Sequence, residues 1–362
     1  MKAGAFFPMT SKKVIRSQNI AIENRVPTIY LVDSAGVFLP LQEDVFPDTD
    51  DFGRVFRNNA VMSAHGHSAD CRHHGHVRGG RRISARDVRS RPDDRWQRTV
   101  SRRPGAGAGR NRAEIFGGRT GWRGDARRHQ RNGGFSRTER RSVSSRAFAR
   151  SLKSGDTGGS LPGTAKKPEA PAIAAEEIYG IYDSVAGASY DMKEVLARVV
   201  DAGRFDEYKA EYGKTLICGY ARIGGFAVGI VANQKLHAQQ TDHEGHKRME
   251  FGGVIYTESA EKAARFIMDC NQNLIPLVFF HDVNGFMVGR DAEWSGIIKA
   301  GAKMVNAVSN SVVPKITVIV GGSFGAGHYA MCGKAYDPRF VFAWPTAKYA
   351  VMSGDSGRRH AG

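Results

Sequence analysis

The chain has 362 residues, which suggests about two domains, and a formal net charge of +17 at pH 7. No apolar run approaches the roughly 18 residues that a membrane span needs, and no secretory signal opens the sequence. The four cysteines are widely spaced and form no CxxC pair, so neither a disulfide framework nor a cysteine zinc site is indicated. These observations lead us to expect a cytoplasmic protein.

The positive charge is confined to one segment. Residues 65–150 contain 23 arginines, no lysine and seven acidic residues, so this segment carries almost all of the net charge. Without Leu, Met or Tyr it cannot bury enough apolar area to offset its ordering entropy. Three interpretations are open: a reading-frame error, a disordered insert, and an arginine-rich arm over residues 72–150 that binds nucleic acid. The abrupt change after Ala64 favours the frame error.

In the N-terminal part, the pattern predicts a helix, a strand and a second helix. Apolar spacing predicts a helix over residues 11–24, capped by Ser11. Residues 28–32 form a short apolar run typical of a buried parallel strand. A second helix is expected over residues 51–64. This order indicates α/β architecture.

Order returns after a linker rich in Gly, Pro and Ser. A helix over residues 291–309 is predicted to turn Trp294 toward its apolar side. The other expected elements are a helix over 191–202, a two-strand hairpin around Gly224 and Gly225, a helix over 259–272, a strand over 276–281, a strand over 315–320, and short strands near 340–343 and 349–352.

One motif occurs twice: a proline is followed six residues later by Asp and nine later by Gly. The copies are Pro27, Asp33 and Gly36, then Pro276, Asp282 and Gly285. Each copy encloses a short apolar strand. Repetition of this kind predicts two related halves.

Residues 321–328, GGSFGAGH, follow the strand predicted over residues 315–320 and open a helix. Such a loop can bring bare N–H groups to a phosphate or an oxyanion, although close helix–strand packing explains the same glycines. The bend over residues 281–289 is expected to converge on the same pocket. A Ser323, His281 or His328, and Asp282 triad is a weaker alternative, because no G-x-S-x-G motif surrounds the serine. A metal site over residues 237–247 is a similarly weak alternative, because its polar, irregular context favours an exposed loop.

Five segments make the chain similar to the carboxyltransferase (beta) subunits of biotin-dependent acyl-CoA carboxylases, the methylcrotonyl-, geranyl- and propionyl-CoA carboxylase group. These segments are 6–48, 52–64, 204–233, 285–305 and 314–340. The resemblance covers most of residues 3–64 and 178–353. Biotin-dependent acyl-CoA decarboxylases of the glutaconyl-CoA type are a related alternative.

The resemblance implies an α/β chain of two crotonase-like ββα spiral domains, the first incomplete. It further implies transfer of a carboxyl group from carboxybiotin to an acyl-CoA. On this basis Ala326 and Gly327 form an oxyanion hole on the biotin side, and Gly285, Phe286 and Gly325 bind biotin. Gly36 and Val37 line the acyl-CoA side. No metal is implied.

The implied partners are a biotin carboxylase or biotin carboxyl carrier subunit and further copies of the carboxyltransferase subunit. The implied domains are a partial acyl-CoA lobe (1–64), the anomalous arginine-rich segment (65–150), a linker (151–177), a biotin lobe (178–353) and an anomalous tail (354–362). A Gly-Gly-Ala loop expected after residue 64 is not recognisable. The chain is therefore expected to be a truncated, frame-shifted member with impaired activity.

Overall fold

The computed structural model describes residues 4–32, 34–66, 69–73, 166–181, 189–241 and 247–352. Asp33, nearly all of the arginine-rich segment, the first part of the linker and the tail from 354 lie outside these ranges. The expectations that concern those residues stay predictions. None of the helices within the described ranges is long and apolar enough to cross a membrane.

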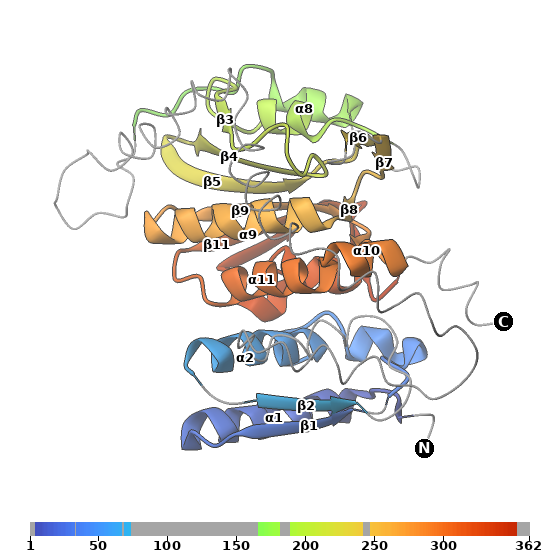
Figure 1. The fold of residues 1–362 in the computed structure, drawn as a ribbon. Helices are drawn as coiled ribbons and strands as arrows, with labels where there is room; N and C mark the ends of the chain where they lie inside the picture. Colours follow the sequence, from blue (N-terminus) through green and yellow to red (C-terminus); the bar gives the residue numbers. More distant parts are fainter. Residues whose placement is uncertain are drawn as a thin grey trace, which may run out of the picture. The chain divides into compact units, whose positions relative to one another are not determined.

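A seven-stranded sheet dominates the C-terminal part (Figure 1). The strand order is β12-β11-β9-β5-β4-β3, and β13 pairs with the end of β11. Neighbours from β5 to β12 are parallel, whereas β3, β4 and β5 are antiparallel. The strands are β3 (Phe205–Glu207), β4 (Leu216–Ile223), β5 (Phe226–Asn233), β9 (Leu277–Val283), β11 (Lys315–Phe324), β12 (Phe340–Ala343) and β13 (Lys348–Ala350).

Helices cover the sheet on its two faces. α9 (Thr257–Gln272) lies in the connection between β5 and β9, and α10 (Arg290–Ser295) and α11 (Ile297–Ser309) lie in the connection between β9 and β11. Along β9, Leu277 and Phe279 join the core cluster that contains α9 and α11. The alternate residues Val278 and Phe280 join a second cluster with α8 (Met192–Ala197). This alternation is expected for a strand buried on two sides.

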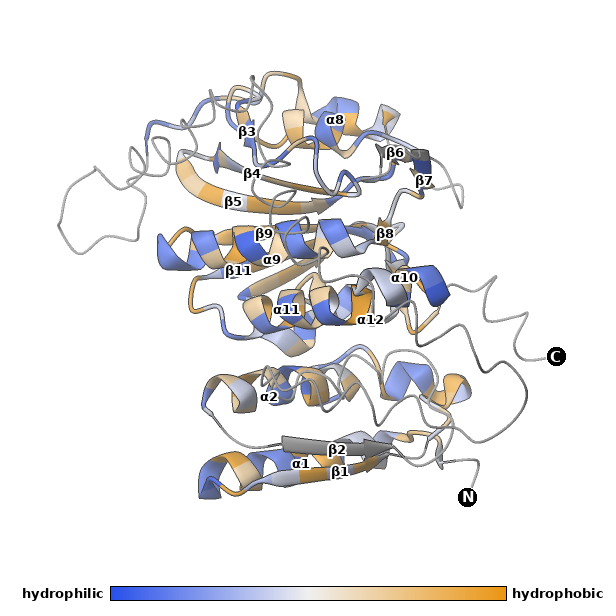
Figure 2. Cartoon of the chain, in the orientation of Figure 1, coloured by the Kyte–Doolittle hydropathy of each residue, from blue (hydrophilic) through white to orange (hydrophobic). Residues whose placement is uncertain are grey.

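The hydropathy pattern agrees with this arrangement. Figure 2 shows β5 as mostly hydrophobic, while α9 alternates hydrophilic and hydrophobic stretches along its length. All seven residues of β9 are buried. Glycines at positions 224 and 225, with φ of +60° and +84°, make the tight turn between β4 and β5, as predicted.

The N-terminal part contains α1 (Pro8–Asn24), β1 (Thr28–Val32), a short 3₁₀ helix (Leu39–Asp44), α2 (Phe52–Ala64) and β2 (Ala69–His73). β1 and β2 are parallel, with Thr28 opposite Ala69. The predicted helices and strand are therefore confirmed.

α2 packs against the C-terminal part through aromatic side chains. The ring of Phe56 lies 5.6 Å from that of Tyr329, and Phe46 lies 5.0 Å from the same ring. A Cβ on Gly53 would lie only 2.7 Å from the Tyr329 ring, so glycine permits this approach. One core cluster thus contains residues from α2 and from the large sheet's helices.

Several predictions about local structure were wrong. Ser11 lies inside α1; Phe7 is the N-cap, and its N–H bonds the Thr10 hydroxyl at 3.2 Å. β1 is not buried, since Ile29 is 65% exposed. The helix over 291–309 is two helices, broken at Gly296 with φ of +92°. This break leaves Trp294 77% exposed.

The remaining helices and strands differ from prediction mainly at their ends. α8 is shorter than the expected helix over 191–202, and α9 begins two residues before Ser259. β11 continues through the expected glycine loop to Phe324, and α12 (Gly325–Ala330) follows at once. The described part also contains β6 (Ala238–Thr241), β7 (Lys247–Glu250), β8 (Val254–Ile255), β10 (Gly285–Phe286) and 3₁₀ helices at Ala175–Gly180 and Lys334–Tyr336.

Candidate functional site

The bends that follow β9 and β11 meet, as the sequence predicts. Gly285 opens β10 with φ of +133°, and Gly325 opens α12 with φ of +55°. A Cβ on Gly327 would lie 2.6 Å from the Cγ2 of Val283 and 3.0 Å from the Cα of Gly285. The two bends therefore touch closely, and position 327 has no room for a side chain.

α12 begins at this contact. The first N–H groups of a helix have no partner within it, and those of Ala326 and Gly327 belong to the first turn. Fixed N–H donors can stabilise negative charge that develops on an oxygen. Phe286 and Ala326 are partly buried against the main core cluster, which holds the two bends in place.

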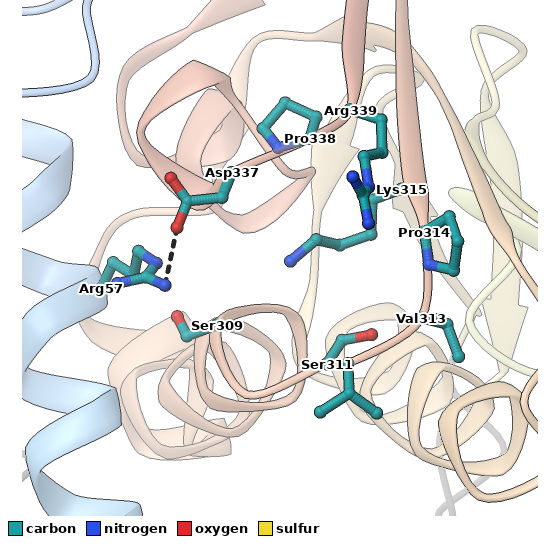
Figure 3. Close-up of a pocket in the computed structure, with 10 residues that line it drawn as sticks. Arg57, Ser309, Ser311, Val313, Pro314, Lys315, Asp337, Pro338 and Arg339 are labelled. Atoms are coloured by element: carbon teal, nitrogen blue, oxygen red, sulfur yellow. Dashed lines mark ion pairs between the residues drawn. The ribbon is translucent and has the colours of Figure 1, made fainter.

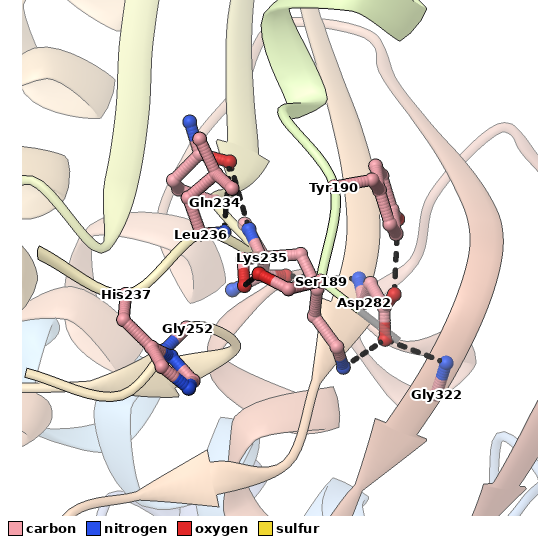
Figure 4. Close-up of polar contacts among 10 residues, drawn as sticks. Ser189, Tyr190, Gln234, Lys235, Leu236, His237, Gly252, Asp282 and Gly322 are labelled. Carbon is pink, nitrogen blue, oxygen red and sulfur yellow. Dashed lines mark hydrogen bonds and ion pairs between the residues drawn. The ribbon is translucent and has the colours of Figure 1, made fainter. Parts of the chain in front are cut away.

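Asp282 anchors the strand ends beneath these bends (Figure 4). Its Oδ1 accepts hydrogen bonds from Lys235 Nζ at 2.8 Å and from the Gly322 N–H at 2.9 Å. Its Oδ2 accepts one from the Tyr190 hydroxyl at 2.9 Å. A Cβ on Gly321 would lie 2.6 Å from Oδ2. The second motif copy thus uses its aspartate to join β9 to the glycine-rich end of β11.

Lys235 is itself held by its neighbours. Gln234 Oε1 accepts the N–H groups of Met192 at 3.0 Å and Lys235 at 2.8 Å. The Ser189 hydroxyl donates to the carbonyl oxygen of Lys235 at 3.1 Å. The lysine that neutralises Asp282 therefore comes from a segment with a fixed backbone.

A chain of hydrogen bonds, here called the relay, joins His281 of β9 and Ser323 of β11 to His328 of α12. The carbonyl oxygen of Met331 lies 2.6 Å from His281 Nε2, so this nitrogen must carry the proton. His281 Nδ1 then accepts from the Ser323 hydroxyl at 2.9 Å. Ser323 Oγ in turn accepts from His328 Nδ1, also at 2.9 Å. The contacts thus assign opposite tautomers to the two histidines.

Burial keeps both imidazoles neutral. It lowers the pKa of His281 to about 4, although the bond to Met331 opposes the change. Burial and the neighbouring His281 lower the pKa of His328 to about 3. The nitrogens of His281 contact a hydroxyl and a carbonyl rather than Asp282. The geometry therefore does not support a Ser-His-Asp triad, and the relay serves to brace α12.

On the N-terminal side, Gly36 and Val37 lie beside residue 6. Phe6 N–H donates to the Gly36 carbonyl at 2.7 Å, and Phe38 N–H donates to the Phe6 carbonyl at 2.9 Å. Gly36 has φ of +106°, and its N–H bonds the Ser34 hydroxyl at 3.3 Å. Val37 is partly buried against the same core cluster as Phe286 and Ala326.

Sequence reasoning missed Tyr190 and Lys235, which lie 92 and 47 residues from Asp282 along the chain. It also suggested a weak metal site around His237, whose Nδ1 accepts the Gly252 N–H at 3.0 Å. Within the described ranges, no three His, Cys, Asp or Glu side chains are grouped so that they could hold a metal ion.

Comparison with known proteins matches residues 1–66 and 152–357 to the carboxyl transferase domain family. The gap in this match coincides with the arginine-rich segment. The mitochondrial methylcrotonoyl-CoA carboxylase beta chain of Dictyostelium discoideum is 41% identical over 98% of this chain and 57% of its own length. The biotin-dependent 3-methylcrotonyl-coenzyme A carboxylase beta1 subunit of Mycobacterium tuberculosis is 40% identical over 98% of this chain and 64% of its own.

The chain thus spans about three fifths of the length of these curated relatives. Among solved structures, a transcarboxylase 12S hexamer with hydrolysed methylmalonyl-coenzyme A bound aligns with a TM-score of 0.53 and 24% identity. That alignment covers 99% of this chain and 66% of the other. It supports the expected fold class of crotonase-like ββα spiral domains.

Proposed function

Because this chain belongs to the carboxyl transferase domain family, we propose that it derives from a subunit that transfers a carboxyl group from carboxybiotin to an acyl-CoA. The observation that supports the proposal is the close approach of Gly285 and Gly327, which joins the bend after β9 to the first turn of α12. The match on both sides of the arginine-rich segment favours this proposal over nucleic-acid binding.

In the proposed site, the chain binds biotin beside Gly285, Phe286 and Gly325. Position 327 packs against Val283 and Gly285, whereas a Cβ on Gly285 would meet no atom within 4 Å, so the open side of this contact is at Gly285. Carboxybiotin supplies the carboxyl group when bound. The N–H groups of Ala326 and Gly327 hold the negative charge that develops on the ureido oxygen, a contribution of about 3 kcal/mol for each donor.

We assign the acyl-CoA side to Gly36 and Val37 within a lobe of residues 1–64, and the biotin side to residues 178–353. The proposed partners are a biotin carboxylase or biotin carrier subunit and further copies of this subunit. Methylcrotonyl-CoA carboxylase relatives favour carboxylation over decarboxylation.

We propose the cytoplasm as the compartment. Cys218, Cys270 and Cys332 are buried free thiols, which fits a reducing environment. Some relatives are mitochondrial proteins, so cell fractionation is the test. Recovery of the chain in the mitochondrial fraction would show that the cytoplasmic assignment is wrong.

Biotin binding tests the site separately from turnover. Free biotin, titrated into the ¹⁵N-labelled chain, should shift the amide signals of Gly285, Ala326 and Gly327. Desthiobiotin, which keeps the ureido ring, should shift the same signals, whereas hexanoate should not. If millimolar biotin shifts none of these amides, the proposed biotin site is wrong.

An assay of carboxyl transfer from carboxybiotin to a panel of acyl-CoA compounds tests whether the enzymatic activity of this chain is impaired. We expect no turnover by this chain, because the family match is interrupted between its two matched parts. Turnover above a no-protein control would support the function and contradict the impairment.

A further inference from the structure

A polar cavity lies at the opposite end of β11 from the candidate site. It has a volume of about 430 Å³ and is bordered by α2, the end of α11, the start of β11 and the loop before β12 (Figure 3). β11 runs ten residues from Lys315 at this cavity to Phe324 at the candidate site. At about 3.3 Å per residue the two ends are on the order of 30 Å apart.

Basic side chains outnumber acidic ones around the cavity. Arg57, Lys315 and Arg339 line it, together with the single acidic residue Asp337. Asp337 is already paired with Arg57 at 2.6 Å and with Arg54 at 2.9 Å. The lining residues alone carry a net charge of about +2, and no further carboxylate in the lining balances Lys315 and Arg339.

Lys315 is the most constrained of these cations. It is 5% exposed, and its Nζ donates to the Val308 carbonyl at 3.2 Å, at the end of α11. Capping that helix end explains one hydrogen bond, whereas an ammonium group has three to donate. Burial, together with the charge of Arg57, lowers the pKa of Lys315. An anion in the cavity would stabilise this buried charge.

Further donors face the same space. Arg57 is paired with Asp337 through a terminal nitrogen, while Arg339 is exposed near Lys315 (Figure 3). Ser311 also lines the cavity, and its hydroxyl donates to Asn271 Oδ1 at 3.4 Å. Guanidinium groups match the oxygens of a phosphate in geometry as well as in charge.

We propose that this cavity binds a phosphoryl group, a dianion that matches the net charge of the lining. The site is separate from the proposed carboxyltransferase site and does not depend on it. Free phosphate and the terminal phosphate of a nucleotide share this chemistry, and a volume of about 430 Å³ lies within the usual range for small-molecule sites.

The test measures binding of inorganic phosphate and of ADP to the full chain by calorimetry, at constant ionic strength set with NaCl. Arg339→Gln changes an exposed side chain, so it should fold like the unmodified chain. Lys315→Met removes the buried charge, and Lys299→Gln serves as a matched control because Lys299 is exposed and does not line the cavity.

We expect Arg339→Gln and Lys315→Met each to weaken phosphate binding by roughly tenfold to a hundredfold, and Lys299→Gln to leave it unchanged. Tighter binding of ADP than of phosphate would identify a nucleotide as the source, and equal binding would identify free phosphate. No phosphate binding by the unmodified chain, or equal weakening by all three variants, would overturn the proposal.

Discussion

Replacing Ser323 by alanine tests the relay that braces α12. The serine is completely buried, and its hydroxyl donates to His281 Nδ1 and accepts from His328 Nδ1. Alanine removes both interactions and leaves two buried imidazole nitrogens without their partner. Each unsatisfied buried group costs about 1–3 kcal/mol, so the free energy of unfolding should fall by about 2–6 kcal/mol.

The measurement is urea denaturation at pH 7.5, followed by circular dichroism. Ser309→Ala is the matched control, because Ser309 is also buried but its hydroxyl bonds only the Val305 carbonyl, four residues earlier in α11. That change should cost about 1 kcal/mol or less. If Ser323→Ala costs no more than the control, the hydroxyl does not join the two histidines.

Nitrogen-15 NMR of the imidazoles gives an independent measurement on the unmodified chain. His281 should be protonated at Nε2 and His328 at Nδ1, since Met331 offers only an acceptor to His281. Finding the same tautomer for both histidines would refute this hydrogen-bond assignment even if Ser323→Ala proved destabilising.

Two further changes test the charges around the candidate site. Burial lowers the pKa of His281 to about 4 and that of His328 to about 3. The free energy of unfolding should therefore fall as the pH drops from 6.5 toward 3, by up to about 1.4 kcal/mol per pH unit for each histidine. Urea midpoints that stay constant between pH 6.5 and 4.5 would contradict this expectation. Asp282→Asn removes the charge partner of Lys235, whose side chain is only 13% exposed, and should cost about 3–5 kcal/mol in urea denaturation. Asp337→Asn, at a 44% exposed side chain, should cost about 1 kcal/mol or less; equal losses would show that Asp282 is not a buried anchor.

Local patterns were sufficient for most of the fold. Apolar periodicity located α2 and β9, and the paired glycines 224 and 225 identified the hairpin, because these signals lie within a few residues of each other. The break at Gly296 was missed because a single glycine can also lie inside a helix at a cost of about 1 kcal/mol.

Prediction of the candidate site from sequence was less complete for a physical reason. The convergence of Gly285 and Gly327 followed from the rule that ligands bind beyond the carboxyl ends of parallel strands. The donors to Asp282 come from segments distant in sequence, and Tyr190 is 92 residues away. No local pattern marks such a partner, so the anchoring role of Asp282 appears only in the folded chain.

The two copies of the repeated motif have different surroundings, and this decides where function is best tested. β9 lies between β5 and β11, and every residue of it is buried. Within the described residues β1 pairs with β2 alone, and Ile29 and Leu31 are 65% and 70% exposed. Burying such side chains is worth about 1.5–3 kcal/mol each, a stabilisation that β1 mostly lacks here. The second copy therefore has the packing that a preorganised site requires, and biotin binding is a more direct test of this chain than acyl-CoA binding.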